Sequence, residues 1–203
     1  MKNMSFIKTV QVTVLALGLM GSASVIAAET YSFDKGHTEI RFSWNHVGIS
    51  TQSARFLDFD GTFVIDKDDP TKSSVDVSFV VDSLMSTVKA FDKDLMSPNF
   101  FDAAKFPKAT FKSTSIRQIS KNAVEVTGDL TIKGITKTVT LDAELLFEGI
   151  HPLGKFIPKY KDAKYTGFKA TGQVLRSDFG LGAFAPLTSD RIVIEINTEL
   201  RKN

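Results

Sequence analysis

Apolar and polar residues alternate along eight separate stretches of this 203-residue chain, and this pattern restricts the possible folds more than any other feature of the sequence. In the first stretch, single polar residues separate Ile40, Phe42 and Trp44. Because successive side chains of a β-strand point to opposite faces, each stretch predicts a strand with one buried face. The predicted strands cover residues 38–47, 54–65, 75–81, 109–119, 124–132, 138–147, 165–175 and 191–200.

The connections between these stretches are mostly short and rich in turn residues. Eight amphipathic strands with short connections are typical of an antiparallel barrel or sandwich. A closed barrel leaves no exposed edge, and eight strands enclose room for side chains or one small ligand. We therefore expect an all-β fold, an eight-stranded antiparallel barrel. Within 54–65, the pair Asp60-Gly61 predicts a long, bent strand with a bulge near the glycine.

Small residues interrupt the inward-facing apolar sets of several strands. Small inward side chains reduce the filling of a barrel and so indicate a cavity, although the narrowing of barrel ends predicts the same residues. The sequence leaves both explanations open. The residues are Ala54, Ser113, Gly128, Ala143, Ala170 and Gly172.

A stretch rich in phenylalanine, residues 97–113, lies between two predicted strands. Ser97 is a suitable N-cap and Pro98 suits the first helical position, so the stretch predicts a short helical insertion. Pro107 ends any such helix. The aromatic side chains are either a plug in the core or a lid over a cavity, and spacing alone does not separate the two.

The N-terminus has the features of a secretory signal peptide. Lys2 and Lys8 precede an apolar run over residues 9–20, and small residues then lead to Ala27-Ala28. We expect a signal peptide over 1–27, with cleavage after Ala27 or Ala28, and one domain over 28–203. The chain contains no cysteine, which excludes disulfides and a lipoprotein anchor.

Removal of this leader leaves no net charge on the remaining chain. Residues 1–28 contain two of the 25 basic residues and none of the 23 acidic residues, so 23 of each sign remain. Proteins that bind nucleic acid usually carry a basic patch, and this sequence has no clustered lysine and arginine residues. We therefore expect no nucleic-acid partner.

The residues that could carry chemistry form no recognisable catalytic or metal-binding motif. The histidines His37, His46 and His151 lack metal-ligand spacing, and no Gly-x-Ser-x-Gly occurs. Asp34 beside His37 predicts a structural hydrogen bond at a strand end, and Arg176 with Asp178 predicts a structural pair across a turn. We expect no enzyme activity, no metal and no cofactor. Two classes remain open: a carrier of an apolar small molecule, and a structural or interaction domain with a filled core.

The chain resembles the YceI-like family of bacterial periplasmic proteins, and the matching motifs run through nearly all of residues 28–203. They include Phe33-Asp34-Lys35-Gly36-His37, His46-Val47-Gly48-Ile49-Ser50, Phe106-Pro107-x-Ala109-Thr110-Phe111, Gly128-Asp129-Leu130-Thr131-Ile132-Lys133-Gly134 and Arg176-x-Asp178-Phe179-Gly180. The resemblance implies a lipocalin-like barrel that binds a polyisoprenoid or a similar amphiphilic lipid. The chain departs from the family in having Ala54 for a usual glycine and Asp94 for a usual histidine, so a head-group role of that histidine is not carried over.

The resemblance and the strand pattern together predict a periplasmic carrier that holds an isoprenoid-like or fatty amphiphilic lipid inside the barrel. The protein would need no stable membrane insertion, and a homodimer stays open. The predicted ligand-binding residues are Phe42, Trp44, Phe56, Phe63, Phe79, Val81, Phe91, Leu95, Phe100, Phe101, Phe111, Leu145, Phe168 and Phe184.

Overall fold

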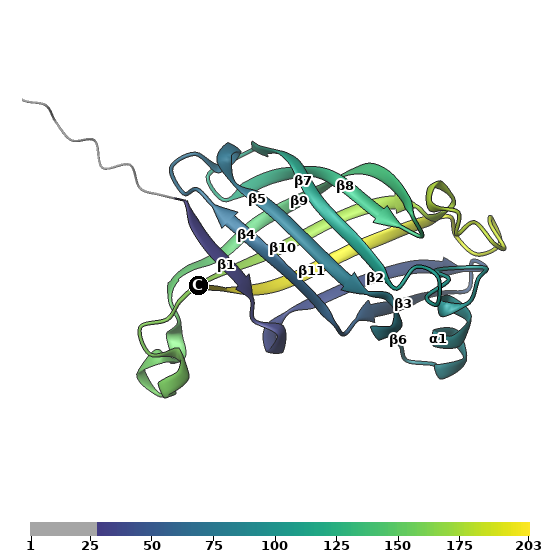
Figure 1. Cartoon of the computed structure of the whole chain (residues 1–203), viewed down its shortest axis with the longest axis horizontal. Coiled ribbons are helices and arrows are strands. Elements are labelled where there is room, and N and C mark those ends of the chain that lie inside the picture. Colours follow the sequence, from purple (N-terminus) through teal and green to yellow (C-terminus); the bar gives the residue numbers. More distant parts are fainter. Residues whose placement is uncertain (1–27) are drawn as a thin grey trace, which may run out of the picture.

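The computed structural model describes residues 28–203, and the predicted signal peptide at 1–27 lies outside these residues. The described chain contains eleven strands, one α-helix and six short 3-10 helices (Figure 1). The helix α1 spans Lys89–Met96. The strands are β1 Glu29–Phe33, β2 Glu39–His46, β3 Ser50–Phe56, β4 Phe59–Ile65, β5 Ser74–Val80, β6 Leu84–Ser86, β7 Lys108–Gln118, β8 Ala123–Ile132, β9 Ile135–Ile150, β10 Lys164–Leu175 and β11 Arg191–Lys202.

The strands close into a barrel of eight long antiparallel strands. Every pairing in the sheet is antiparallel, and β11 pairs with β1 at one end and with β2 at the other, which closes the sheet. The segments β1 and β2 thus act as one long strand interrupted by the short 3-10 helix η1, Lys35–His37. In the same way β3 continues into β4, and β5 into β6. The predicted eight-stranded antiparallel barrel is confirmed.

The bend between β3 and β4 lies at Leu57 and Asp58, before the predicted Asp60-Gly61 position. Both backbone N–H groups of this bend donate to the side chain of Ser83, at 3.2 and 2.9 Å. Gly61 instead pairs regularly with Val77 inside the sheet. A Cβ at Gly61 would lie 2.9 Å from the carbonyl oxygen of Asp76, so this glycine permits close packing and does not form a bulge.

The helical insertion is also displaced from its predicted position. The helix α1 ends before the aromatic stretch, and Ser97 is its C-cap, where its N–H donates to the carbonyl of Asp94. The ψ angle of Ser97 is 164°, an extended conformation that a following proline favours. Residues 98–106 then form successive turns, in which the Phe101 N–H donates to the Leu95 carbonyl at 2.9 Å. The Ser97-Pro98 pair therefore ends a helix and does not begin one.

A charged cluster holds the first strand against the last strand at one end of the barrel. Glu29 of β1 accepts hydrogen bonds from Lys202 of β11 and from the Tyr31 hydroxyl, the latter at 2.7 Å. The ammonium groups of Lys67 and Lys164 lie 3.1 and 3.6 Å from the same carboxylate. The hydrogen bonds from Lys202 and Tyr31 hold the pKa of Glu29 well below its ordinary value of 4.5. Burial and the bond to Glu29 raise the pKa of Tyr31 to about 12.

We expect Glu29→Gln to lower the free energy of unfolding by about 2 kcal/mol at pH 7, because it weakens hydrogen bonds made to a largely buried charged group. A carboxyl group with a lowered folded-state pKa stabilises the fold above its unfolded pKa and loses that contribution as the pH falls. The difference between the two proteins should therefore shrink below pH 4.5. Urea unfolding at neutral and acidic pH measures it. A difference that stays constant through the acidic range would contradict this assignment.

Candidate functional site

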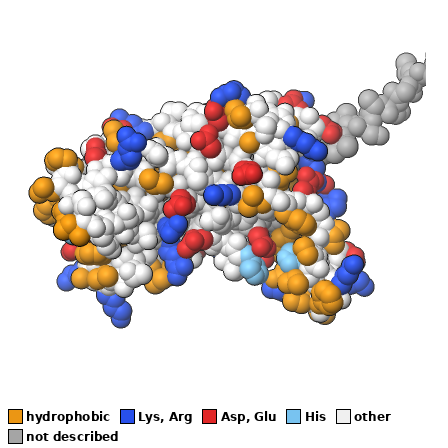
Figure 2. Space-filling model, turned by 180° about the vertical axis from the view of Figure 1, so that it is seen from behind, with side chains coloured by type: hydrophobic (Ala, Val, Ile, Leu, Met, Phe, Trp, Pro, Cys, Tyr) orange, Lys and Arg blue, Asp and Glu red, His pale blue; other side chains and the backbone are white. Residues whose placement is uncertain are grey.

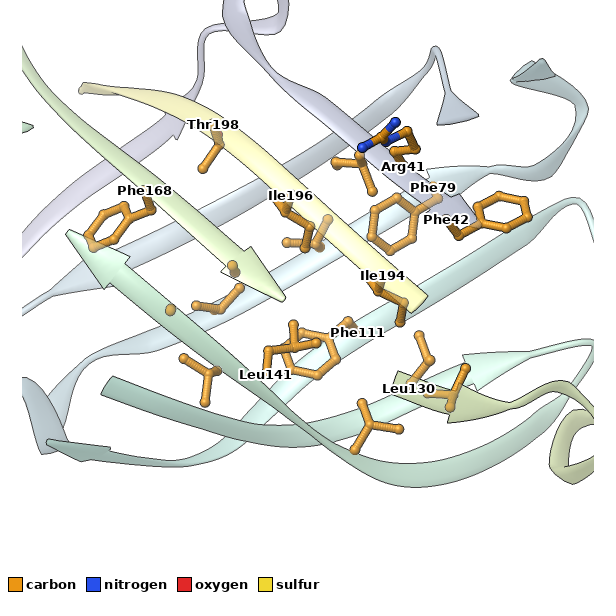
Figure 3. Close-up of a pocket in the computed structure, with 18 of the residues that line it drawn as sticks. Arg41, Phe42, Phe79, Phe111, Leu130, Leu141, Phe168, Ile194, Ile196 and Thr198 are labelled. Atoms are coloured by element: carbon orange, nitrogen blue, oxygen red, sulfur yellow. The ribbon is translucent and has the colours of Figure 1, made fainter. Parts of the chain in front are cut away.

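A cavity of about 710 Å³ runs through the barrel interior. Inward side chains of strands on all sides line it, including Phe111 of β7, Leu141 of β9 and Ile194 of β11 (Figure 3). The lining is mostly apolar because each strand turns its apolar alternate residues inward. Pockets of this size and character are typical of sites for small apolar ligands.

Four of the six small inward residues predicted from the sequence fall into two groups. Ala143 and Ala170 are direct neighbours on β9 and β10, and both line the cavity. The glycines instead make room for neighbouring side chains. A Cβ at Gly128 would lie 2.6 Å from the ring of Phe111, and one at Gly172 would lie 2.4 Å from Leu141. Only part of the small-residue pattern thus creates empty space.

The structure places thirteen of the fourteen predicted ligand-binding residues on the cavity wall. Val81 is the one that does not line it. The chain leaves the sheet at this residue to begin the 3-10 helix η3, Val81–Ser83, and Val81 packs into the core with 2% of its surface exposed. Whether the thirteen others hold a ligand stays a prediction. The lining residues are Phe42, Trp44, Phe56, Phe63, Phe79, Phe91, Leu95, Phe100, Phe101, Phe111, Leu145, Phe168 and Phe184.

The two adjacent phenylalanines of the aromatic stretch have different surroundings. Phe101 is buried, with 7% of its surface exposed, and its ring centre lies 6.0 Å from Phe42 and 6.2 Å from Phe56. Phe100 is half-buried and faces Phe184 at 6.3 Å, on the loop after β10. Both rings border the cavity. Phe101 therefore anchors the turn segment to the barrel, and Phe100 with Phe184 covers one end of the cavity.

The loop that carries Phe184 is held by the buried guanidinium of Arg176. This side chain, 7% exposed, donates to the backbone carbonyls of Ser189 and Thr188 at 2.9 and 2.8 Å. It also donates to the carbonyls of Leu181 and Ala183. Burial lowers the pKa of Arg176, and the nearby charge of Asp190 acts in the opposite direction.

Asp178, the partner that the sequence predicts for Arg176, is wrong. The four hydrogen bonds of Arg176 go to carbonyl oxygens, and the nearby carboxylate of Asp190 accepts from the N–H and hydroxyl of Ser177 at 2.9 and 2.7 Å. Every residue carries a carbonyl group, so the choice of backbone acceptors has no signature in the sequence.

Polar residues gather where the cavity reaches the opposite end of the barrel. Lys67 is the central charge there, and it contacts the carboxylates of Glu29 and Glu148. Burial lowers the pKa of Lys67, but the hydrogen bonds to Glu148 and Glu29 outweigh it and raise the pKa above its ordinary value. This end of the cavity is thus polar, and charged or polar residues line it elsewhere as well, namely Arg41, His46, Asp94, Arg176 and Thr188. The other polar lining residues at this end are Asp66, Ser73, Ser74, Gln118, Lys121 and Asn122.

A second polar group lies outside the cavity, at the break between β1 and β2. His37 Nδ1 lies 3.2 Å from Asp34 Oδ2, the structural contact that the sequence predicts, and Glu199 joins them so that all three ligand atoms fall within 4.8 Å. These residues could hold a metal ion. Burial raises the pKa of Asp34, but hydrogen bonds from His37 and from the Gly36 N–H outweigh it and keep this pKa low.

This group of three has no signature in the sequence because Glu199 lies far from the other two residues in the chain. Only the pairing of β1 with β11 brings them together. The expectation that the protein needs no metal stays a prediction. Within residues 28–203, no helix is long and apolar enough to span a bilayer.

The closed eight-stranded barrel with an apolar interior cavity defines the class of protein, a lipocalin-like barrel. The pattern of the YceI-like domain matches residues 31–200, and the chain belongs to this family. The YceI proteins of Salmonella arizonae and Salmonella heidelberg are each 36% identical over 187 residues, which cover 91% of this chain and 93% of theirs. The resemblance stated from the motifs is confirmed.

Solved structures show the same barrel. The YceI protein of Campylobacter jejuni is 26% identical, with a TM-score of 0.69 over 78% of this chain and 90% of its own. BcnA of Burkholderia cenocepacia matches with a TM-score of 0.72 at 22% identity, over 82% and 98% of the two chains. A polyisoprenoid binding domain of Saccharophagus degradans, implicated in plant cell wall breakdown, matches with a TM-score of 0.60 at 12% identity, over 85% and 98%.

Proposed function

We propose that this protein binds a long isoprenoid-like lipid in the barrel cavity and carries it through the periplasm. The observation that supports this most strongly is the cavity itself, about 710 Å³ in volume and lined by phenylalanine, leucine, isoleucine and valine side chains. Burying one CH₂ group of a lipid contributes about 0.8 kcal/mol, so ten groups contribute about 8 kcal/mol before the costs of association. A chain of that kind would gain far more from this interior than from water.

The distribution of polar groups supports an amphiphile over a purely apolar ligand. The apolar side chains that form most of the lining suit a hydrocarbon chain, and the polar end around Ser74, Lys121 and Asn122 suits its head group. The Saccharophagus relative is described as a polyisoprenoid binding domain, which agrees with this class of ligand. The second candidate, a structural domain with a filled core, is disfavoured by the volume of the cavity. The predicted signal peptide supports a periplasmic location.

We expect Ala170→Phe to weaken binding of a fluorescent geranylgeranyl probe about a hundredfold or more. Ala170 lines the cavity beside Ala143, so a phenyl ring there displaces several CH₂ groups of the probe. Because the ring enters empty space, the free energy of unfolding should change by less than about 1.5 kcal/mol. Fluorescence titration and urea unfolding measure the two effects.

The matched control is Lys169→Phe, which adds the same side chain on the exposed face of the same strand. It should leave the affinity for the probe unchanged. The proposed function is wrong if the wild-type protein does not bind the probe, or if Ala170→Phe and Lys169→Phe bind it equally well.

A further inference from the structure

The cavity does not account for the segment between β9 and β10. Residues 151–163, here called the lobe, form two consecutive 3-10 helices, η4 Pro152–Lys155 and η5 Pro158–Tyr160. The lobe projects from the barrel at the end opposite α1 (Figure 1). None of its residues lines the cavity. Its structure therefore serves something other than the enclosed site.

The lobe has a defined internal structure. The ring of Tyr160 is buried and stacks on His151, with ring centres 3.9 Å apart. The His151 N–H donates to the carbonyl of Ala163 at 2.9 Å and closes the neck of the lobe. Inside it, the Ile157 N–H donates to the carbonyl of Leu153 at 2.8 Å. These bonds and the Tyr160 anchor hold the backbone, so the exposure of other side chains results from the fold of the lobe.

Three large apolar side chains of the lobe face outward. Phe156 is 78% exposed, and Leu153 and Ile157 are exposed beside it. In Figure 2 apolar side chains gather on the projection at the lower right, with basic groups at their margin. An exposed aromatic ring on an ordered projection contributes little to folding. Contiguous exposed apolar side chains of this kind mark surfaces that contact a membrane or an apolar surface of another protein.

The same projection is basic, although residues 29–203 as a whole carry no net charge. Lys155, Lys159 and Lys161 lie on the lobe against a single acidic residue, Asp162. All three lysines are exposed. The exposed apolar side chains of the lobe are thus flanked by positive charges. This combination complements a membrane surface, in which anionic head groups cover an apolar interior.

We propose that the lobe docks the protein on an anionic phospholipid surface. Phe156, Leu153 and Ile157 enter the boundary between head groups and acyl chains, and the lysines contact lipid phosphates. The charge on the lobe favours this partner over an apolar protein surface, because each lysine near an anionic membrane strengthens binding about fivefold. The proposal concerns the outer surface of the protein and holds whatever the cavity contains.

The test is flotation of the protein with vesicles of phosphatidylcholine, made with and without phosphatidylglycerol. The chain is expressed in full, so that each variant is processed in the same way. We expect binding to the anionic vesicles that weakens as salt is added. Phe156→Ser should weaken it at least about tenfold. The double change Lys155→Glu and Lys161→Glu should weaken it about twenty-five-fold or more, and only on anionic vesicles.

Two substitutions at the other end of the barrel are matched controls. Ile49→Ser removes an apolar side chain that is 84% exposed, and Lys137→Glu reverses an exposed charge. Both should bind vesicles like the wild type, and thermal unfolding should show all variants folded. The proposal is overturned if the wild type does not float with anionic vesicles, or if the controls weaken binding as much as the lobe variants. Self-association that requires Phe156 and occurs without vesicle binding would also overturn it, because the lobe would then contact a second copy of the chain.

Discussion

Phe101→Ala is expected to lower the free energy of unfolding by about 3 to 5 kcal/mol, the usual cost of removing a buried phenylalanine. The ring of Phe101 contacts Phe42 and Phe56 and is almost fully buried, so the substitution leaves a void at the end of the core. Residues 98–106 depend on this anchor because they form turns without a regular helix of their own. Urea unfolding measures the change directly.

Phe100→Ala should behave differently although it changes the adjacent residue. The Phe100 ring is half-buried and packs against Phe184, so its loss should cost only about 1 kcal/mol of stability. It opens the cover over one end of the cavity, and a bound fluorescent isoprenoid should then leave five- to tenfold faster. Stopped-flow dilution of the loaded protein measures the release rate.

The control for both substitutions is Phe156→Ala, which removes an exposed ring far from the cavity. It should change neither stability nor release. Equal and large losses of stability for Phe100→Ala and Phe101→Ala, with an unchanged release rate, would show that the aromatic segment only plugs the core. A normal unfolding midpoint for Phe101→Ala would contradict the assignment of Phe101 as the anchor.

The second large effect is expected at Arg176. Replacing it with methionine should lower the free energy of unfolding by about 3 to 4 kcal/mol, because four backbone carbonyls lose a charged donor and solvent reaches only some of them. Since these bonds hold the loop that carries Phe184, the release of a bound lipid should also become faster. Urea unfolding measures the loss of stability, and stopped-flow dilution of the loaded protein measures the release rate.

Arg176→Lys separates charge from geometry. An ammonium group keeps the positive charge but has no planar fork of donors, so it cannot reach four separate carbonyls. We expect it to recover less than half of the lost stability. The matched control, Arg191→Met, removes an exposed guanidinium bonded to Gln173, and it should change stability by no more than about 0.5 kcal/mol. Full stability of Arg176→Lys would mean that the charge alone is needed.

The strand pattern predicted the barrel correctly because each strand buries one face, so apolar and polar residues alternate along every strand. Ile40 and Phe42 alternate with polar neighbours, and both face the interior. A helix beginning at Ser97 was predicted wrongly from equally local signals. Ser97 and Pro98 can begin a helix or follow one. The bonds from the Ser97 N–H to Asp94 and from the Phe101 N–H to Leu95 show that they follow one here.

The sequence by itself determined the class of fold and most of the cavity wall, since both follow from which residues are apolar and at what spacing. It could not separate Phe100 from Phe101, because the same residue type stands at both positions and only packing against Phe42 and Phe56 distinguishes them. It also could not predict that Arg176 bonds to carbonyls or that Glu199 joins Asp34 and His37. The residues in those contacts become neighbours only when the barrel closes and its loops fold back. Because they are separated by no fixed spacing along the chain, no sequence pattern indicates them.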